Sequence, residues 1–227
     1  MLSAIAIVPS APVLVPELAG AAAAEVADLR AATIAAAALL PSRWIAVGTG
    51  DADQTVKQNA AGTFAGFGVD VPVRLSPQAD SSAELPLCAL MAAWVRGQAR
   101  PEASAHVRVL RRDHVVEVAL AQGRRLRAEI EAASEPVGVL IVADGANTLT
   151  PKAPGAFDPG AADAQQALDE ALACGDVSGL RGLSPLIVGR VAFQVMAGLT
   201  EPGPRWAKEL YRGAPYGVGY FAGVWQL

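Results

Sequence analysis

The sequence VGVLIVA, residues 137–143, decides the fold class of this chain because it is an unbroken apolar run rich in β-branched residues. A run of this kind predicts a strand in the middle of a parallel sheet, with helices covering both of its faces. It leads directly into the polar residues Asp144, Gly145, Ala146 and Asn147. The segment therefore predicts an α/β fold and a polar loop at the end of a central strand.

Similar apolar runs alternate with helix-length patterns on both sides of this segment. Because strands that alternate with helices are typical of a sheet covered on both faces, we predict one three-layer α/β/α domain, residues 1–227, with a mostly parallel sheet. The predicted strands are residues 4–8, 44–47, 107–110, 137–143 and the closing GVGYFAGVW at 217–225; the predicted helices are 16–40, 85–95, one capped by Asp113, one from Asp158 to Cys174, and one from Ser184 to Gly198. Residues 62–75 predict irregular or hairpin structure.

Composition excludes several classes of protein. The chain has 52% hydrophobic and 18% charged residues, which indicates a folded globular protein, and its net charge of −4 argues against a nucleic-acid-binding surface. Its two cysteines, Cys88 and Cys174, are too few and too far apart for a disulfide scaffold or a thiolate zinc site.

The sequence also argues against export and membrane insertion. The N-terminal segment lacks a basic region and is interrupted by Pro9 and Pro12, which is unlike a signal peptide. The alanine-rich run at 20–40 is interrupted by Glu25, Asp28 and Arg30, too soon for a membrane span. We therefore expect a cytoplasmic protein that does not bind membranes.

Polar residues follow three of the predicted strands. In open α/β sheets the ligand crevice lies beyond the carboxyl ends of the strands, so these residues are the candidate pocket. They are Ser10, then Thr49 and Asp51, then Asp144 and Asn147, and Lys152 and Arg190 would favour a small polar or anionic ligand if they face the crevice. The alternative is that these residues only cap helices and form turns.

Metal or phosphate binding has weaker support in the residues themselves. Asp51, Asp53 and Asp144 could offer oxygen ligands to a hard cation such as magnesium, the alternative being loop solvation and helix capping. The segment Gly48–Gly50 could hold a phosphate through backbone N–H groups, but it lacks the spacing and the lysine of a P-loop. The two histidines, His106 and His114, are separated by arginines, so we expect surface or capping roles for them.

Four segments resemble a known family: IVPSAPVLVPEL at 7–18, GTFAGFGVDV at 62–71, VADGANTLTPKAPGAFDP at 142–159 and APYGVGYF at 214–221. In this order the chain resembles the family of the iron-binding subunit of class III extradiol ring-cleavage dioxygenases, in its short stand-alone branch. The resemblance implies an α/β/α sandwich. In active relatives it also implies a non-haem ferrous ion, held by two histidines and one glutamate, that binds a catechol and dioxygen, with a further histidine as acid/base.

This chain departs from the family at each of these positions. Ser10 stands where relatives have the first histidine, and Gly48–Gly50 where the second ligand would follow the next strand. Asn147 corresponds to the acid/base histidine, and the glutamate's counterpart lies at Gly189 or Arg190. A serine hydroxyl is a weak ligand, glycine has no side chain, and arginine would repel a dication. The sequence therefore predicts that no iron is held, that no cofactor is needed, and that Asn147 cannot exchange a proton.

Three functions remain open from the sequence. The first is a dioxygenase-like pseudoenzyme that serves as a small-molecule-binding or regulatory protein. The second is a metal-dependent dioxygenase or oxidoreductase that acts on a catechol with an unusual ligand set. The third is a metal-independent hydrolase that uses Ser10, which would need a base such as Lys152 beside it. Because relatives commonly self-associate, we expect a homo-oligomer, joined through the glycine-rich C-terminal strand or the helix at 85–95.

Overall fold

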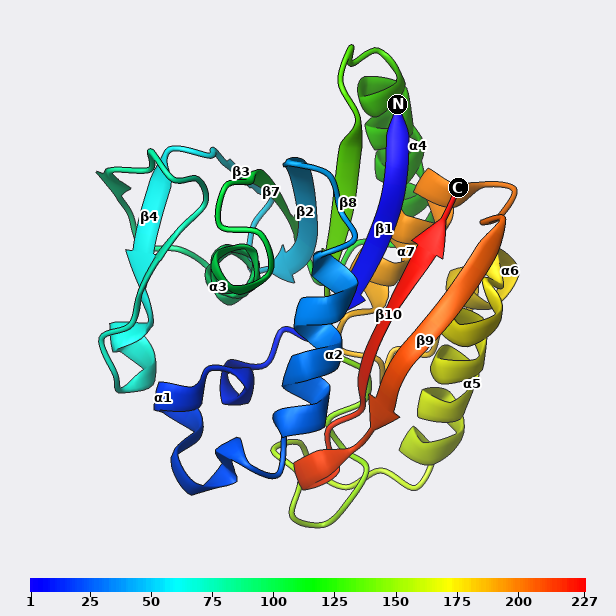
Figure 1. The fold of residues 1–227 in the computed structure, drawn as a ribbon. Coiled ribbons are helices and arrows are strands. Elements are labelled where there is room, and N and C mark those ends of the chain that lie inside the picture. The colour runs from blue at the N-terminus through cyan, green and yellow to red at the C-terminus, as the bar shows by residue number, and fades with distance from the viewer.

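A computed structural model describes all residues from Met1 to Leu227, which fold as a single α/β domain (Figure 1). The strands are β1 (Leu2–Val8), β2 (Arg43–Gly50), β3 (Gln54–Val56), β4 (Ala60–Thr63), β5 (Pro72–Arg74), β6 (Ser81–Ser82), β7 (Ser104–Arg111), β8 (Val137–Val142), β9 (Trp206–Gly213) and β10 (Tyr220–Gln226). The α-helices are α1 (Pro16–Ala19), α2 (Ala27–Ala37), α3 (Leu87–Ala99), α4 (Val116–Glu131), α5 (Ala161–Cys174), α6 (Val177–Arg181) and α7 (Arg190–Thr200).

The main sheet has seven strands in the order β3-β7-β2-β8-β1-β10-β9. Its four central strands, β7, β2, β8 and β1, are parallel to one another. The outer strands β3, β10 and β9 pair antiparallel. The expectation of a mostly parallel sheet is therefore wrong: the sheet is mixed, because the chain returns along one side as a β9–β10 hairpin and along the other as β3.

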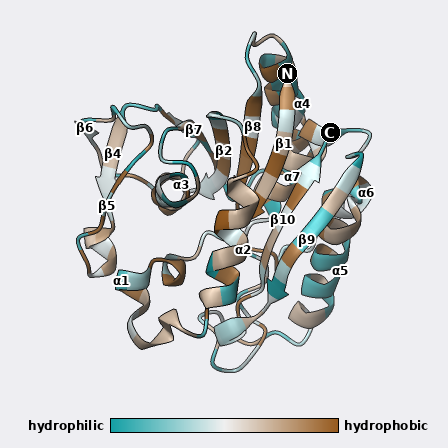
Figure 2. Cartoon of the chain, viewed as in Figure 1, coloured by the Kyte–Doolittle hydropathy of each residue, from teal (hydrophilic) through white to brown (hydrophobic).

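Helices cover both faces of this sheet. In Figure 1, α2 lies in front of the strands and α4 and α7 lie behind them. Side chains alternate between the two faces along each strand, so Ala6 and Val8 of β1 belong to the core under α2 and α3, whereas Ile5 and Ile7 belong to the core under α4 and α7. Figure 2 shows the central strands as the most hydrophobic part of the chain, as the VGVLIVA run predicts.

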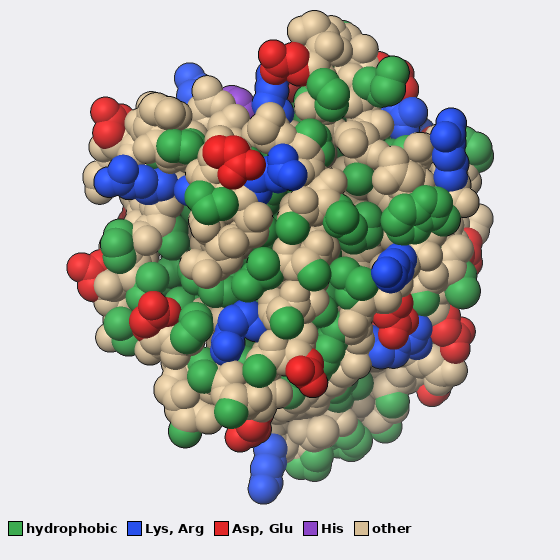
Figure 3. Space-filling view, viewed as in Figure 1, with side chains coloured by type: hydrophobic (Ala, Val, Ile, Leu, Met, Phe, Trp, Pro, Cys, Tyr) green, Lys and Arg blue, Asp and Glu red, His purple; other side chains and the backbone are tan.

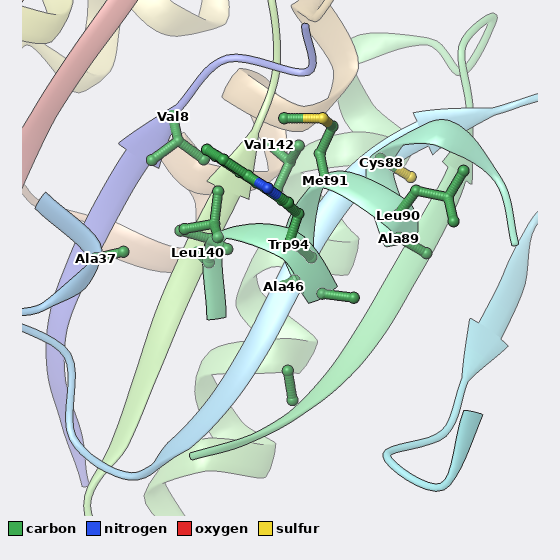
Figure 4. Packing of buried hydrophobic residues seen from close by; sticks show 14 of the residues in the cluster. Val8, Ala37, Ala46, Cys88, Ala89, Leu90, Met91, Trp94, Leu140 and Val142 are labelled. Atoms are coloured by element: carbon green, nitrogen blue, oxygen red, sulfur yellow. The ribbon is translucent and has the colours of Figure 1, made fainter. Parts of the chain in front are cut away.

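Helix α3 packs on the sheet through large apolar side chains. Figure 4 shows Trp94 and Met91 next to Val8, Leu140 and Val142 of the central strands. Nine consecutive residues of this helix, from Cys88 to Arg96, are buried. The strand β10 is likewise covered, because it lies between β1 and β9. The C-terminal strand and the helix at 85–95, which the sequence suggested as contact surfaces for a homo-oligomer, are thus mostly buried within the domain. Self-association itself stays a prediction.

Helices α4 and α7 touch through their backbones. A Cβ atom on Gly123 would lie 2.1 Å from the carbonyl oxygen of Val195, and one on Gly198 would lie 2.2 Å from that of Leu120. Only glycine permits so close an approach of two helices. Gly123 weakens the intrinsic helix propensity of α4, but the packing of α4 on α7 requires it.

Several predicted elements differ in detail. The helix expected at 16–40 is split into α1, a short 3-10 turn and α2, because Gly20 adopts a positive φ of 52°. Asp113 does not cap α4: its carboxylate pairs with Arg111, and Val115 takes the N-cap position. The helix expected from Ser184 begins only at Arg190. Strand β9 has no counterpart in the sequence prediction.

The surface bears charges of both signs. Figure 3 shows lysines and arginines interspersed with aspartates and glutamates on the face that carries α2. None of the helices combines the length and the apolar character that a membrane span requires.

Candidate functional site

Three of the family-like segments meet at the carboxyl edge of the parallel strands. The backbone N–H of Ser10, after β1, donates to Oδ1 of Asp144, after β8, at 2.8 Å. The backbone of Gly219, just before β10, bonds in both directions to the segment after β8: Gly145 N–H donates to Gly219 O, and Gly219 N–H donates to Ala146 O. We call Ser10, Asp144, Asn147 and Tyr220 the Asp144 cluster.

Asp144 is the most perturbed acid of this cluster. Burial raises the pKa of Asp144 from an ordinary 3.8 to about 7, and the hydrogen bond from Ser10 offsets only part of that effect. No arginine or lysine pairs with it. Burial also raises the pKa of Tyr220, and the Asp144 carboxylate adds to that rise. An acid that titrates near neutral pH at a strand end can both donate and accept a proton, which is a property of functional sites.

A buried glutamine holds the two loops of this edge together. Oε1 of Gln165, on α5, accepts from Ala146 N–H at 2.8 Å, and its Nε2 donates to Asp169 at 2.9 Å. The Gln165 amide leaves no space for a side chain at Gly145 or Gly219, since a Cβ at either would lie 2.0 Å from Oε1. These two glycines are therefore required by packing.

At Gly48, within the segment that the resemblance aligns with the second iron ligand, and at Gly189, one of two counterparts of the glutamate, neighbouring atoms fill the space. A Cβ on Gly48 would lie 2.4 Å from Cβ of Cys88, and a Cβ on Gly189 would lie 2.5 Å from Cβ of Ala143. Gly189 also donates its N–H to Asp144 O at 2.8 Å. Neither position has room for a longer side chain, so the space is packed with protein.

The segment Gly48–Gly50 is strand, contrary to the loop expected from the sequence. β2 continues through Gly50, with Gly48 paired to Val109 and Thr49 to Leu110 of β7. This pairing engages the backbone with β7, so the segment does not form the open cradle that a phosphate needs.

A second group of charges lies after β2 and β7. Nε2 of His114 is 2.8 Å from Oδ1 and 2.9 Å from Oδ2 of Asp53, and the backbone N–H of Arg111 donates to Asp53 at 2.7 Å. These contacts hold the pKa of Asp53 below its ordinary value, the Arg111 N–H having the largest effect. The guanidinium of Arg190 donates to the carbonyl of His114. We call Asp53, Arg111, His114 and Arg190 the His114 cluster.

The predicted pocket residues are thus divided. Ser10, Asp144 and Asn147 follow β1 and β8, whereas Arg190 joins the His114 cluster and Thr49 lies within β2. Asp51 is exposed and pairs with Arg112 at 2.7 Å. Lys152 is exposed, and no hydrogen bond links it to Ser10. The structure therefore does not assemble all seven candidates into one pocket.

The potential metal ligands are similarly scattered. No group of three or more histidine, cysteine, aspartate or glutamate side chains lies close enough together to hold a metal ion, so Asp51, Asp53 and Asp144 do not converge. His106 lies in β7, and His114 lies beyond the end of that strand. The strand from His106 to Arg111 is about 16 Å long at roughly 3.3 Å per residue, so the two histidines are too far apart to bind one metal ion.

The sequence did not predict the His114–Asp53 pair or the roles of Gln165 and Tyr220. Each depends on a contact between elements far apart in the sequence: 61 residues separate Asp53 from His114. The glycines at 145 and 219 were the one sequence signal for the Gln165 contact, because glycine before or after a strand indicates close approach of another group.

Comparison with known proteins gives a fold but no family. No protein-family model matches the chain, and no curated protein matches it. Among solved structures, the chain is similar to an uncharacterised protein, JW3007, from Escherichia coli K12, with a TM-score of 0.60 and 13% identity. The match covers 98% of this chain and 99% of that one. At this identity it supports the single-domain α/β fold alone.

Proposed function

We propose that the chain is an extradiol-dioxygenase-like protein that has lost its iron site and acts as a small-molecule-binding or regulatory protein. The observation that carries the proposal is the packing of Gly48 and Gly189, where neighbouring atoms occupy the space that ligating side chains would need. Loss by substitution alone would leave a vacant pocket. Here the neighbouring side chains and backbone have closed around the substituted positions.

The remaining donors do not fit a ferrous ion. The Asp144 cluster offers one carboxylate, Asp144, two hydroxyls, Ser10 and Tyr220, one amide, Asn147, and no imidazole. Ferrous centres that activate dioxygen use two histidines and a carboxylate. Burial further favours the neutral form of the Asp144 carboxyl, which weakens it as a ligand because a metal binds the carboxylate. The residues of this edge therefore support no catalytic step through iron.

The same edge can recognise a small polar molecule. A neutral Asp144 carboxyl offers one O–H donor, and the Ser10 hydroxyl and the Asn147 amide offer both donors and acceptors. Near neutral pH the Asp144 carboxyl can lose its proton, so the affinity of a ligand for this cluster would depend on pH. A polar ligand able to accept a hydrogen bond fits this set better than a metal ion does.

The two enzyme alternatives have less support. A hydrolase built on Ser10 needs a base beside its hydroxyl, but the hydrogen bond that Ser10 makes to Asp144 uses the backbone N–H, and Lys152 is exposed. A dioxygenase with an unusual ligand set needs several donors at one place, and the acids and histidines are dispersed.

Metal analysis tests the proposal directly. Protein produced in iron-rich medium and purified without chelator should contain far less than one iron per chain by plasma mass spectrometry. Oxygen uptake with a panel of catechols should stay at the background rate when ferrous ion is added. One tightly held iron per chain, or catechol turnover that chelation abolishes and ferrous ion restores, would overturn the proposal.

A further inference from the structure

A cavity lies on the face of the sheet that carries α4, away from the Asp144 cluster. It has a volume of about 290 Å³ and is bounded by β2, β3 and β7 on one side and by α4 and α7 on the other. Its floor is apolar and includes Leu110, Leu126 and Val195, which belong to the core under α4 and α7. This volume is at the small end of the range for ligand pockets. None of Ser10, Asp144 or Asn147 lines it, so a ligand in this cavity does not depend on the function proposed above.

Two acids, Asp53 and Glu129, and two arginines, Arg108 and Arg125, line this cavity, and three of the four are paired. Nη2 of Arg108 lies 2.7 and 3.0 Å from the two carboxylate oxygens of Glu129, and Nη1 of Arg108 donates to Thr55. Asp53 is engaged by His114 and by the Arg111 N–H. Arg125 forms no ion pair and no side-chain hydrogen bond. One cation is thus left without a partner at the rim of an apolar hollow.

The lining already holds one arginine–carboxylate contact. A single guanidinium nitrogen of Arg108, Nη2, donates to both oxygens of Glu129, while its Nη1 donates to Thr55. Arg125 and Glu129 are four residues apart on α4, so they lie on one face of the helix, and both line the cavity. A ligand carboxylate that enters the cavity meets the unpaired Arg125 beside this existing pair.

We propose that this cavity binds a small organic monocarboxylate with an aromatic or branched aliphatic body. Its carboxylate pairs with Arg125, and its body lies on the floor formed by Leu110, Leu126 and Val195. The exposed Arg108–Glu129 pair borders both this cavity and a second hollow of about 270 Å³. Charge at the rim and an apolar floor together set the ligand class.

The test separates the charge from the body of the ligand. Phenylacetate is titrated into the full-length protein, followed by backbone amide shifts in two-dimensional NMR and by calorimetry. Its neutral isostere, phenylacetamide, and acetate, which has the charge without the body, are titrated in parallel. We expect phenylacetate to bind and to change the amide shifts of β3, β7 and α4. The affinity of each of the other two molecules should be lower by about tenfold or more.

Two matched variants assign the charge. R125Q should weaken phenylacetate binding about tenfold and leave the weak binding of phenylacetamide unchanged. R127Q is the control, because Arg127 lies on the same helix but pairs with Glu131 and does not line the cavity. Both side chains reach the surface, so neither change should unfold the protein. The proposal fails if phenylacetate does not bind, if phenylacetamide binds equally well, or if R127Q weakens binding as much as R125Q.

Discussion

The Asp144 cluster and the His114 cluster lie at the same edge of one sheet, yet an aspartate behaves oppositely in the two. Asp144 is deeply placed, accepts one backbone hydrogen bond and has no cationic partner, and its pKa rises to about 7. Asp53 is exposed, accepts from Arg111 N–H and contacts the His114 ring, and its pKa falls. At Asp144 the loss of solvent raises the carboxyl pKa more than one hydrogen bond lowers it. At the exposed Asp53 the hydrogen-bond donors have the larger effect and lower the pKa.

The two clusters also differ in how tightly the chain is packed around them. Gly189 is packed directly against the backbone of Asp144, whereas Asp53 borders an open cavity. The space beside Gly48 and Gly189 is thus filled where the resemblance implies chemistry, and a cavity lies in a region to which the resemblance assigns no role.

The largest effect is expected from restoring a side chain beside Asp144. G189E places a glutamate at one of the two positions, Gly189 and Arg190, that the resemblance aligns with it, but its Cβ would lie 2.5 Å from Cβ of Ala143 and 2.8 Å from the carbonyl oxygen of Asp144. We expect a loss of about 4 kcal/mol or more in unfolding free energy, measured by urea denaturation, or insoluble protein.

Alanine at two glycines provides the control for that experiment. G189A should still destabilise the protein by about 1 to 3 kcal/mol, since the contact is made by Cβ itself. G97A, in α3, meets no atom within 4 Å and should be neutral or stabilise by about 0.5 to 1 kcal/mol. A stable G189E that gains iron would show that the Asp144 cluster is an open site after all.

The next largest effect concerns the Asp144 carboxyl. Because its folded pKa of about 7 exceeds the ordinary 3.8, the folded state binds the proton more tightly, and stability falls as pH rises between these values. D144N keeps an acceptor for Ser10 N–H and removes the charge. It should match the wild type near pH 4 and be more stable at pH 8, by up to about 4 kcal/mol at 1.36 kcal/mol per pKa unit. Denaturation across this pH range measures the difference, and a pH-independent difference would contradict the assignment.

The smallest effect is expected at Asp53. Its folded pKa lies below the ordinary value, so the carboxylate stabilises the fold above that value and loses the effect as pH falls through the lowered pKa. D53N should therefore cost less than about 1 kcal/mol at pH 7, because exposed pairs contribute little, and the cost should vanish in acid. Thermal denaturation at several pH values checks this. If D53N changed the unfolding free energy more than D144N does, the comparison between the two aspartates would be wrong.

The central part of the fold could be predicted from the sequence, but the edges of the sheet could not. β1, β2 and β8 are buried on both faces, so their residues form continuous apolar runs. Strand β9 is an edge strand with Lys208, Glu209 and Arg212 in it, and its pattern of exposed and half-buried positions gives no clear alternation. Missing β9 also concealed the antiparallel hairpin that makes the sheet mixed.

The candidate site was predicted in the same uneven way. The meeting of Ser10 with Asp144 follows from the rule that parallel strands end at one edge, and it requires no detail of the loops. The contact between Arg190 and His114 could not be predicted in this way, because it depends on where α7 begins and on how α7 packs against α4. The shifted pKa of Asp144 depends on the depth of burial, which strand order alone does not give.

The backbone contact between α4 and α7 at Gly123 and Gly198 bears on how costly ligand capture would be. Side chains that interlock can slide and repack, but two backbones in direct contact leave no such freedom. Helix α4, which carries Arg125 and Leu126, is therefore held against α7 before any ligand binds. Association then costs little ordering of the backbone in this wall, so less of the contact energy of a small acid is lost to ordering the protein.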